Sequence, residues 1–352
     1  MNKKTMTSME RFISSLLLKT PDKVPLCLLF SCYGAKERKI PIKEYFSNPD
    51  LIVSTQLLLR EKYKTDCLYT FSYSPLEIEA FGGEVIFSND GPPNSGEHII
   101  KNDLDINKLE IPKISQTPCL LRTLEVTSKL KIAVKDTVPI IGVVMSPFSL
   151  PIMQMGFENY LNLIYLNKPY FLKLMHKNIE FCTTWANAQL KAGATTIFYF
   201  DPLSSGDFIS RNLYLSTGYK VAQKALSTLN GFYGVNLVSA KALSIIDDLI
   251  NLEAKYVGFS TNDDIVKIKA AANKRICLFG NLNGIKMINW SNHDIINNVK
   301  SIIKHAGKDG GLILAENHGE IPLQVPEEVL LGISNAVEEF GYYPLNWCNY
   351  NG

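Results

Sequence analysis

Short apolar segments recur along the chain, and each is apolar at nearly every position instead of at alternate positions. This pattern is typical of strands that are buried on both faces of a parallel sheet. The segments cover residues 24–30, 65–71, 139–145, 195–200, 232–237, 255–260, 275–281 and 311–317. The pattern therefore predicts eight strands.

Between these strands, apolar residues recur at spacings of three and four with charged residues between them, which predicts amphipathic helices. A leading helix is expected within residues 1–20, and residues 74–116 have the composition of an insertion after the second strand. The other predicted helices cover residues 50–63, 117–134, 158–192, 211–230, 240–252, 263–273, 292–306 and 326–340.

Strands that alternate with helices predict an α/β protein, and eight such strands favour a closed (β/α)8 TIM barrel. An open doubly wound sheet is the alternative. No low-complexity linker or shift in composition divides the 352 residues. Residues 1–352 are therefore predicted to form a single domain.

The composition excludes several classes of protein. Hydrophobic residues make up 46% of the chain, and 36 Lys and Arg stand against 34 Asp and Glu, which gives a formal net charge of +2. A disordered chain would have fewer apolar residues and a larger net charge, and a nucleic-acid-binding protein would normally show a basic excess. We therefore expect a folded protein with no nucleic-acid partner.

The cysteines and the apolar runs bear on the compartment. Seven cysteines are scattered through apolar segments without a CxxC pair, which predicts buried thiols in a reducing cytoplasm. The N-terminal segment places Glu10 and Arg11 where a signal peptide needs apolar residues. The longest uncharged run, residues 137–157, contains three prolines and is a poor candidate for a membrane helix. We expect a cytoplasmic protein with no membrane association.

In α/β barrels the reacting groups lie at the C-terminal ends of the strands and in the loops that follow. Most residues that the sequence places there are polar but uncharged. Those predicted to bind a substrate are Ser31, Tyr33, Tyr73, Ser146, Ser205, Asp207, Arg211, Asn236 and Ser239.

The densest polar cluster covers residues 198–211, where an apolar strand leads to Asp201 and then to a loop rich in Ser and Gly. Asp201 and Asp207 are candidates to bind a polar or cationic group, and Arg211 is a candidate to bind a carboxylate. Asp201 is also a predicted catalytic residue. The structural alternative is that Asp201 caps the following helix.

A second cluster covers residues 315–322 and contains His318 and Glu320, which are both predicted to be catalytic. His318 is the one histidine of five at a predicted strand end, where it could act as an acid, a base or a metal ligand. A hydrogen-bonded structural histidine is the alternative. Cys32 also follows a predicted strand, but it has no Cys or His partner nearby in sequence, so we expect a buried thiol.

Other catalytic signatures are absent from the sequence. It has no phosphate-binding loop, no GxGxxG after a strand, no GxSxG and no HExxH. The residues alone therefore predict an α/β-barrel enzyme with a serine-rich and mildly acidic mouth.

Several segments are similar, in order and spacing, to those of one superfamily. The chain resembles the superfamily of uroporphyrinogen decarboxylase and the cobalamin-dependent methyltransferases, such as methylcobalamin:coenzyme M methyltransferase. This resemblance implies a (β/α)8 barrel. The segments are MERF (9–12), PDKVP (21–25), EAFGGEV (79–85), VPIIGVVMSPFSL (138–150), GFENYL (156–161), AGATTIFYFDPLSSGDFISR (192–211), FGNLNG (279–284) and LILAENHGEIPLQVPEEV (312–329).

Within this superfamily, decarboxylases carry an Arg-Gln-Ala-Gly-Arg-Tyr signature after the first strand and an Asp at the end of the second. The present chain has Phe30-Ser31-Cys32-Tyr33-Gly34-Ala35 at the first place and FSYS (71–74) at the second. Without the arginines, a substrate with eight carboxylates has no evident counter-charge. The resemblance therefore implies the methyltransferase branch.

The methyltransferases of this group usually bind zinc through a His-x-Cys after the fifth strand and a Cys after the eighth. Leu237 and Ser239 stand at the His-x-Cys positions, and His318 stands at the last Cys. Leucine cannot bind zinc and serine is a poor ligand. Only His318 keeps a metal-binding group, so zinc is expected to be absent or weakly bound.

Three functions remain open. The favoured one is a methyltransferase that moves a methyl group between methylcobalamin, or another corrinoid carried by a partner protein, and a small-molecule methyl donor or acceptor. The second is a decarboxylase or lyase that acts on a small acid or a tetrapyrrole. The third is a non-catalytic barrel that binds a corrinoid or tetrapyrrole, because a fold does not by itself define a function.

Overall fold

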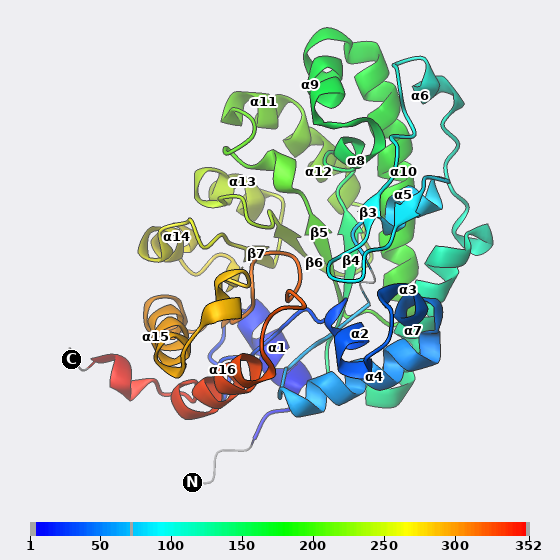
Figure 1. Ribbon diagram of the computed structural model, residues 1–352. Coiled ribbons are helices and arrows are strands. Elements are labelled where there is room, and N and C mark those ends of the chain that lie inside the picture. Colours follow the sequence, from blue (N-terminus) through cyan, green and yellow to red (C-terminus); the bar gives the residue numbers. More distant parts are fainter. Residues whose placement is uncertain (1–4, 71–72, 350–352) are drawn as a thin grey trace.

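The computed structural model describes residues 5–70 and 73–349. Phe71 and Ser72, at the end of the predicted second strand, lie outside the described residues. The described chain forms a curved parallel sheet with helices around its outer face (Figure 1). No helix in the described ranges is long and apolar enough to cross a membrane.

The sheet contains seven parallel strands in the order β1-β4-β5-β6-β7-β8-β9. Neighbouring strands follow each other along the chain, as expected when each strand is connected to the next by helices. The strands are β1 (Leu68–Tyr69), β4 (Ile140–Met145), β5 (Thr196–Phe200), β6 (Phe232–Asn236), β7 (Tyr256–Gly258), β8 (Cys277–Phe279) and β9 (Leu312–Ile313). Seven of the eight predicted strands are thus found, each inside its expected segment.

The predicted first strand, residues 24–30, is the exception, because it forms no regular strand. Its backbone reaches both edges of the sheet: Cys27 N–H donates to the Leu314 carbonyl at 2.8 Å, and the Leu26 carbonyl accepts from Asp66 N–H at 2.6 Å. Side chains accept from other donors of this segment, since Leu26 N–H donates to the Asp66 carboxylate and Leu28 N–H to Thr65 Oγ1. These side-chain acceptors replace the carbonyls that a continuous ladder would supply.

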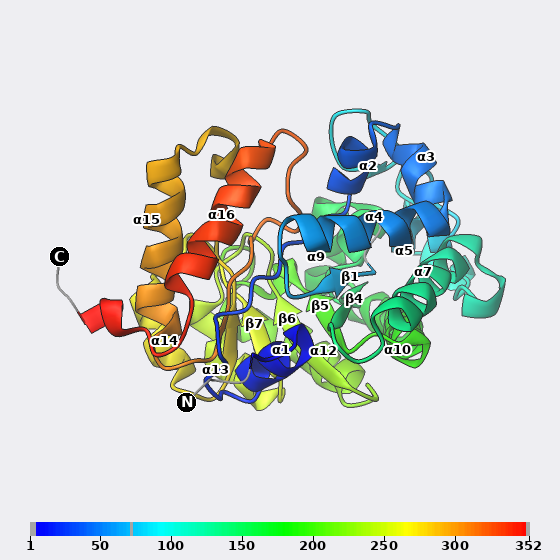
Figure 2. The same cartoon turned by 90° about the horizontal axis from the view of Figure 1, so that it is seen from below.

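The helices follow the predicted order, but several are shorter or divided. Predicted helix 158–192 is divided at Asn167, beside Pro169, and predicted helix 211–230 is divided at Thr217. Figure 2 shows α15 beside α16 and α4 beside α7, and these pairs are in contact. The helices are α1 (Ser8–Leu16), α2 (Tyr33–Arg38), α3 (Ile42–Ser47), α4 (Pro49–Lys62), α5 (Leu76–Ala80), α6 (Asp105–Lys108), α7 (Pro118–Val134), α8 (Pro151–Met155), α9 (Phe157–Leu166), α10 (Lys168–Ala192), α11 (Arg211–Ser216), α12 (Gly218–Leu226), α13 (Ile246–Asn251), α14 (Ile265–Ala272), α15 (Asn292–Ile302) and α16 (Glu327–Phe340).

The inner face of the curved sheet is packed with aromatic and aliphatic side chains. Phe198 lies at the centre of this cluster, with its ring centroid 4.8 Å from those of both Tyr256 and Phe279. Helix α1 packs against the same cluster through Phe12 and Leu16. Its Arg11 forms salt bridges with the half-buried carboxylate of Asp22 and the buried carboxylate of Asp66. The inner space is therefore filled at this level, and a cavity can form only nearer the strand ends.

The expected insertion after the second predicted strand is present. It contains α5, α6 and a small antiparallel hairpin of β2 (Val85–Ile86) and β3 (Asn94–Ser95). Helix α5 and the hairpin loop both contribute residues to a cavity at the C-terminal edge of the sheet.

Candidate functional site

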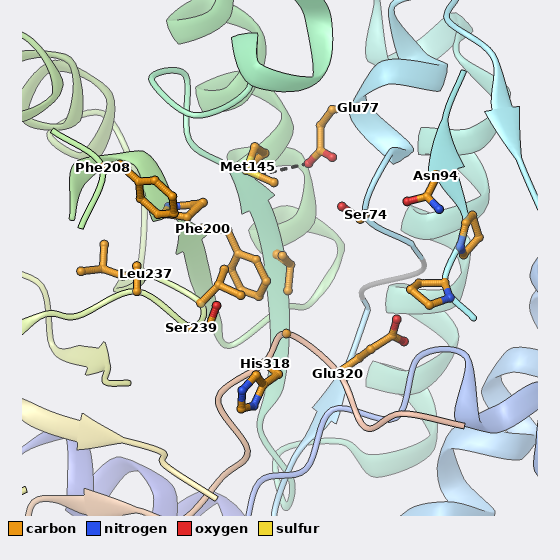
Figure 3. Close-up of a pocket in the computed structure, with 17 residues that line it drawn as sticks. Ser74, Glu77, Asn94, Met145, Phe200, Phe208, Leu237, Ser239, His318 and Glu320 are labelled. Atoms are coloured by element: carbon orange, nitrogen blue, oxygen red, sulfur yellow. Dashed lines mark hydrogen bonds between the residues drawn. The ribbon is translucent and has the colours of Figure 1, made fainter. Parts of the chain in front are cut away.

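A cavity of about 380 Å³ lies where the parallel strands end (Figure 3). Its walls are mostly apolar, and its ionisable side chains are Glu77, His318 and Glu320. Its position agrees with the rule that parallel α/β sheets bind ligands at the C-terminal ends of their strands. The lining residues are Ser74, Glu77, Pro92, Pro93, Asn94, Val143, Met145, Phe200, Pro202, Phe208, Leu237, Val238, Ser239, Ala240, His318, Gly319 and Glu320.

Glu77 of α5 is an ionisable lining residue that the sequence analysis missed. Its side chain is buried, and Oε1 accepts a hydrogen bond from the backbone N–H of Met145 at 3.2 Å (Figure 3). Burial raises the pKa of Glu77 to about 7, against an ordinary value of 4.5. The carboxyl is therefore near its midpoint of ionisation at neutral pH, which suits a group that exchanges protons.

Glu320 follows β9 and lines the cavity, as the sequence predicted for this strand end. Its Oε2 accepts hydrogen bonds from Ser31 Oγ and from the backbone N–H of Cys32, the latter at 3.1 Å. Burial also raises the pKa of Glu320. Ser31 therefore positions Glu320 and does not itself line the cavity.

His318 is half-buried and lines the cavity next to Gly319. Its Nδ1 is buried and has no hydrogen-bond partner within the described part of the chain. Burial lowers the pKa of His318, so the neutral imidazole is favoured near pH 7. A neutral ring with one free nitrogen can accept a proton from a bound molecule.

The loop after β6 forms another part of the cavity wall, through Leu237, Val238 and Ser239. Val238 has φ 56°, which is an unfavourable conformation for a β-branched residue. Asn236 stabilises this turn, because its Oδ1 accepts from the backbone N–H of Val238 at 2.8 Å. The turn directs Leu237 and Ser239 to the cavity, whereas Asn236 acts through the backbone and is not a lining residue.

Asp201 does not line the cavity, in contrast to the expectation from its position after β5. Its carboxylate is buried and accepts hydrogen bonds from three hydroxyls, with Oγ distances of 2.6 Å for Ser146, 2.7 Å for Ser149 and 2.5 Å for Ser204. Burial raises the pKa of Asp201 while these hydroxyls oppose the change. Asp201 and Ser146 therefore form an internal network that joins the loops after β4 and β5.

The other candidates of residues 198–211 also make internal contacts. Ser205 Oγ donates to the Lys241 carbonyl at 2.7 Å, and the exposed Asp207 accepts from Lys241 N–H at 2.9 Å. Arg211 binds the carboxylate of Asp248 through two nitrogens, at 2.9 and 2.8 Å. The expectation that Arg211 is available for a substrate carboxylate is therefore not supported by its geometry.

The two predicted tyrosines lie away from the cavity. Tyr33 is buried in α2 and donates from its hydroxyl to the Val325 carbonyl at 3.1 Å. Tyr73 donates to Glu79 and accepts from Arg122 at 3.3 Å, so it lines a separate hollow with these two residues. The strand-end rule placed both tyrosines at the correct edge but could not give the direction of their side chains.

The cavity residues do not fit a zinc ion. In residues 5–70 and 73–349, no three His, Cys, Asp or Glu side chains are grouped so that they could hold a metal. Leu237 and Ser239 lie in the cavity with His318, but this set offers only one good zinc ligand. The expectation that zinc is absent or weakly bound stays a prediction.

A cavity with three ionisable groups at the C-terminal edge of a parallel sheet is the arrangement found in α/β enzymes. Residues 7–340 match the family model of uroporphyrinogen decarboxylase (URO-D). The chain belongs to this family, as the sequence resemblance indicated.

Curated relatives support the assignment at low identity. The chain is 24% identical to uroporphyrinogen decarboxylase of Coxiella burnetii over 355 residues, which cover 94% of this chain and 95% of that protein. It is 23% identical to the enzyme of the same name from Geobacter sulfurreducens, with 91% and 96% covered.

Solved structures show the same fold. A methyltransferase from Methanosarcina mazei superposes with a TM-score of 0.82 at 21% identity, over 95% of this chain and 99% of that one. A B12-independent methionine synthase from Shewanella sp. has a TM-score of 0.54 at 11% identity, over 91% and 94% of the two chains.

Proposed function

We propose that this protein transfers a methyl group between a corrinoid on a separate protein and a small neutral or cationic methyl compound bound in the cavity. The observation that carries the proposal is the chemistry of the lining. Apolar walls surround Glu77, His318 and Glu320, and no Arg or Lys is found among the described lining residues.

This lining disfavours decarboxylation of a porphyrinogen or of a small acid. Carboxylate substrates need cationic partners, most often arginine, to offset their loss of solvation. Arg211, which the sequence predicted to bind a carboxylate, is bound to Asp248 instead. A carboxylate in this cavity would instead meet two acidic side chains.

The cavity residues can hold and move a proton during methyl transfer. When a methyl group leaves a neutral donor, the remaining atom gains an electron pair and needs a proton or a hydrogen bond. Glu77, with a pKa of about 7, can supply that proton at neutral pH. In the reverse direction, the neutral imidazole of His318 can take a proton from the acceptor.

The corrinoid would supply the cobalt centre that accepts or provides the methyl group. The fold shared with the Methanosarcina methyltransferase supports methyl transfer, whereas the corrinoid is proposed from the resemblance of the sequence to cobalamin-dependent methyltransferases. No step is assigned to zinc, because the residues do not fit it. We also propose that segment 24–30, which hydrogen bonds to both edges of the sheet, completes a closed barrel in the manner of an eighth strand.

The test is the visible spectrum of a corrinoid protein in its methylated and reduced states, recorded with this protein and a panel of methyl donors and acceptors. A spectral change that depends on both the protein and the small molecule is expected. Glu77→Gln should slow it, and Glu158→Gln, at an exposed position of α9, should not. No change with any companion corrinoid protein would contradict the proposal.

A further inference from the structure

Two acidic side chains in the cavity lack a counter-charge. Glu77 and Glu320 form no salt bridge with any residue of the described chain. Burying an ionised carboxyl without a cationic partner is costly. The structure therefore contains two sites at which a positive charge would be stabilised.

Each of these carboxyls has one oxygen held and one oxygen free of protein donors. Oε1 of Glu77 accepts from Met145 N–H, and Oε2 of Glu320 accepts from Ser31 and Cys32. Across the described residues, Glu77 Oε2 and Glu320 Oε1 receive no hydrogen bond. The protein thus fixes each carboxyl through one oxygen and leaves the other oxygen for a ligand.

The remaining walls suit methyl groups. Phe200 and Phe208 line the cavity together with Val143, Met145 and Leu237. Aromatic faces attract cations, and quaternary ammonium groups are commonly bound by aromatic residues. A cavity of about 380 Å³ is within the usual range for small-molecule sites.

We propose that the cavity binds an N-methylated ammonium compound, with Glu77 and Glu320 as counter-charges and the Phe200 and Phe208 rings against its methyl groups. The inference rests on the proposed methyl transfer in the same cavity. It names the substrate class as a cationic methyl donor.

Within residues 5–70 and 73–349 no three His, Cys, Asp or Glu side chains are grouped to hold a metal, and a cationic nitrogen needs none. When the methyl carbon–nitrogen bond breaks, its electron pair stays on nitrogen, and the ammonium becomes a neutral amine. The methyl group would pass to a corrinoid in its Co(I) state on the partner protein, and the corrinoid's electron pair would form the new bond to the methyl carbon. The amine product is neutral, so Glu77 can regain its proton from solvent, and the leaving group needs no activation by a metal.

Calorimetric titration with choline and with its uncharged isostere, 3,3-dimethylbutan-1-ol, tests the cation directly and needs no corrinoid. Choline should bind about tenfold more tightly than the isostere, as expected for one desolvated cation–carboxylate or cation–π contact. Glu77→Gln and Glu320→Gln should each remove most of this preference. Glu158→Gln should retain it.

Proton release gives a second measurement. Titrations at pH 6.5 in buffers with different ionisation heats should show that choline displaces a proton from the folded protein, and this release should be lost in Glu77→Gln. The titratable groups around Glu77 are Cys119 of α7 and Cys182 of α10, whose pKa values burial raises, with His318 and Glu320 in the same cavity. Neither thiol is ionised at this pH.

The outcomes separate the two proposals. Equal affinity for choline and the isostere, or unchanged choline affinity in folded Glu77→Gln and Glu320→Gln, overturns the ammonium site while leaving methyl transfer from a neutral donor open. Choline binding that depends on both glutamates, without methylation of any corrinoid, supports the site and overturns the methyl transfer. Circular dichroism of each variant verifies folding.

Discussion

Glu77→Gln should make the protein more stable at alkaline pH and leave its stability unchanged in acid. In the folded protein the pKa of Glu77 is about 7, whereas its ordinary value is 4.5. The folded state therefore holds this proton more tightly than the unfolded state. The contribution of protonated Glu77 to the free energy of unfolding is fully present below about pH 4.5 and is lost as the pH rises through 7.

The magnitude follows from the same two values. One pKa unit corresponds to about 1.36 kcal/mol, so the raised pKa costs the folded protein about 3 kcal/mol once Glu77 is ionised. The glutamine side chain of the variant would carry no charge, and its amide oxygen could still accept from Met145 N–H. We expect an increase of about 3 kcal/mol in the free energy of unfolding at pH 8.5 and little change at pH 4.5.

Urea denaturation of wild type, Glu77→Gln and Glu158→Gln across this pH range measures the effect. Glu316 is also buried with a pKa raised to about 7, so ionisation of both Glu77 and Glu316 will destabilise wild type as the pH rises. The difference in unfolding free energy between wild type and Glu77→Gln isolates the contribution of Glu77. The exposed control should follow wild type at every pH. A difference that does not change with pH, or a variant that is less stable at pH 8.5, would refute the reasoning.

Three further results are expected. Asp201→Ala should lower the free energy of unfolding by roughly 3 kcal/mol or more, because it leaves three buried serine hydroxyls without their acceptor. Asp201→Asn should lower it less, since the amide Oδ1 can still accept from two of these hydroxyls. Urea denaturation of both variants measures the difference. Elemental analysis after zinc addition and dialysis should find substoichiometric zinc, and a full equivalent that disappears in His318→Ala would contradict the cavity geometry. All seven cysteines are buried and free, so a thiol reagent should react only slowly with the native protein. After unfolding, the same reagent should label all seven thiols. Fast labelling of the native protein would contradict this burial.

The fold was largely predictable because buried parallel strands leave a local signal, a short run that is apolar throughout. Residues 24–30 carry the same signal but do not form a strand. The difference depends on Thr65 and Asp66, whose side chains accept the backbone donors of Leu28 and Leu26. These side-chain acceptors lie about forty positions away in the sequence, so residues 24–30 alone do not reveal them.

The site was predicted only in part, because sequence position fixes the edge of the sheet but not the direction of a side chain. His318, Glu320 and Ser239 face the cavity, whereas Asp201 turns toward three serines. Glu77 was missed because it lies on a helix inside an apparent insertion. A signal was present, since this glutamate stands between Leu76 and Ile78 a few residues after a predicted strand.

The cost of Glu77 and its proposed use have the same physical origin. An ionised carboxyl that is buried without a cation destabilises the ligand-free protein, and an arginine nearby would offset this destabilisation. Such an arginine would also fill the position of a cationic ligand and attract anionic ones instead. In the proposed ammonium site, the ligand supplies the positive charge that the cavity residues lack. If choline raises the stability of wild type more at pH 8.5 than at pH 5.5, and does not do so in Glu77→Gln, the ligand supplies that charge.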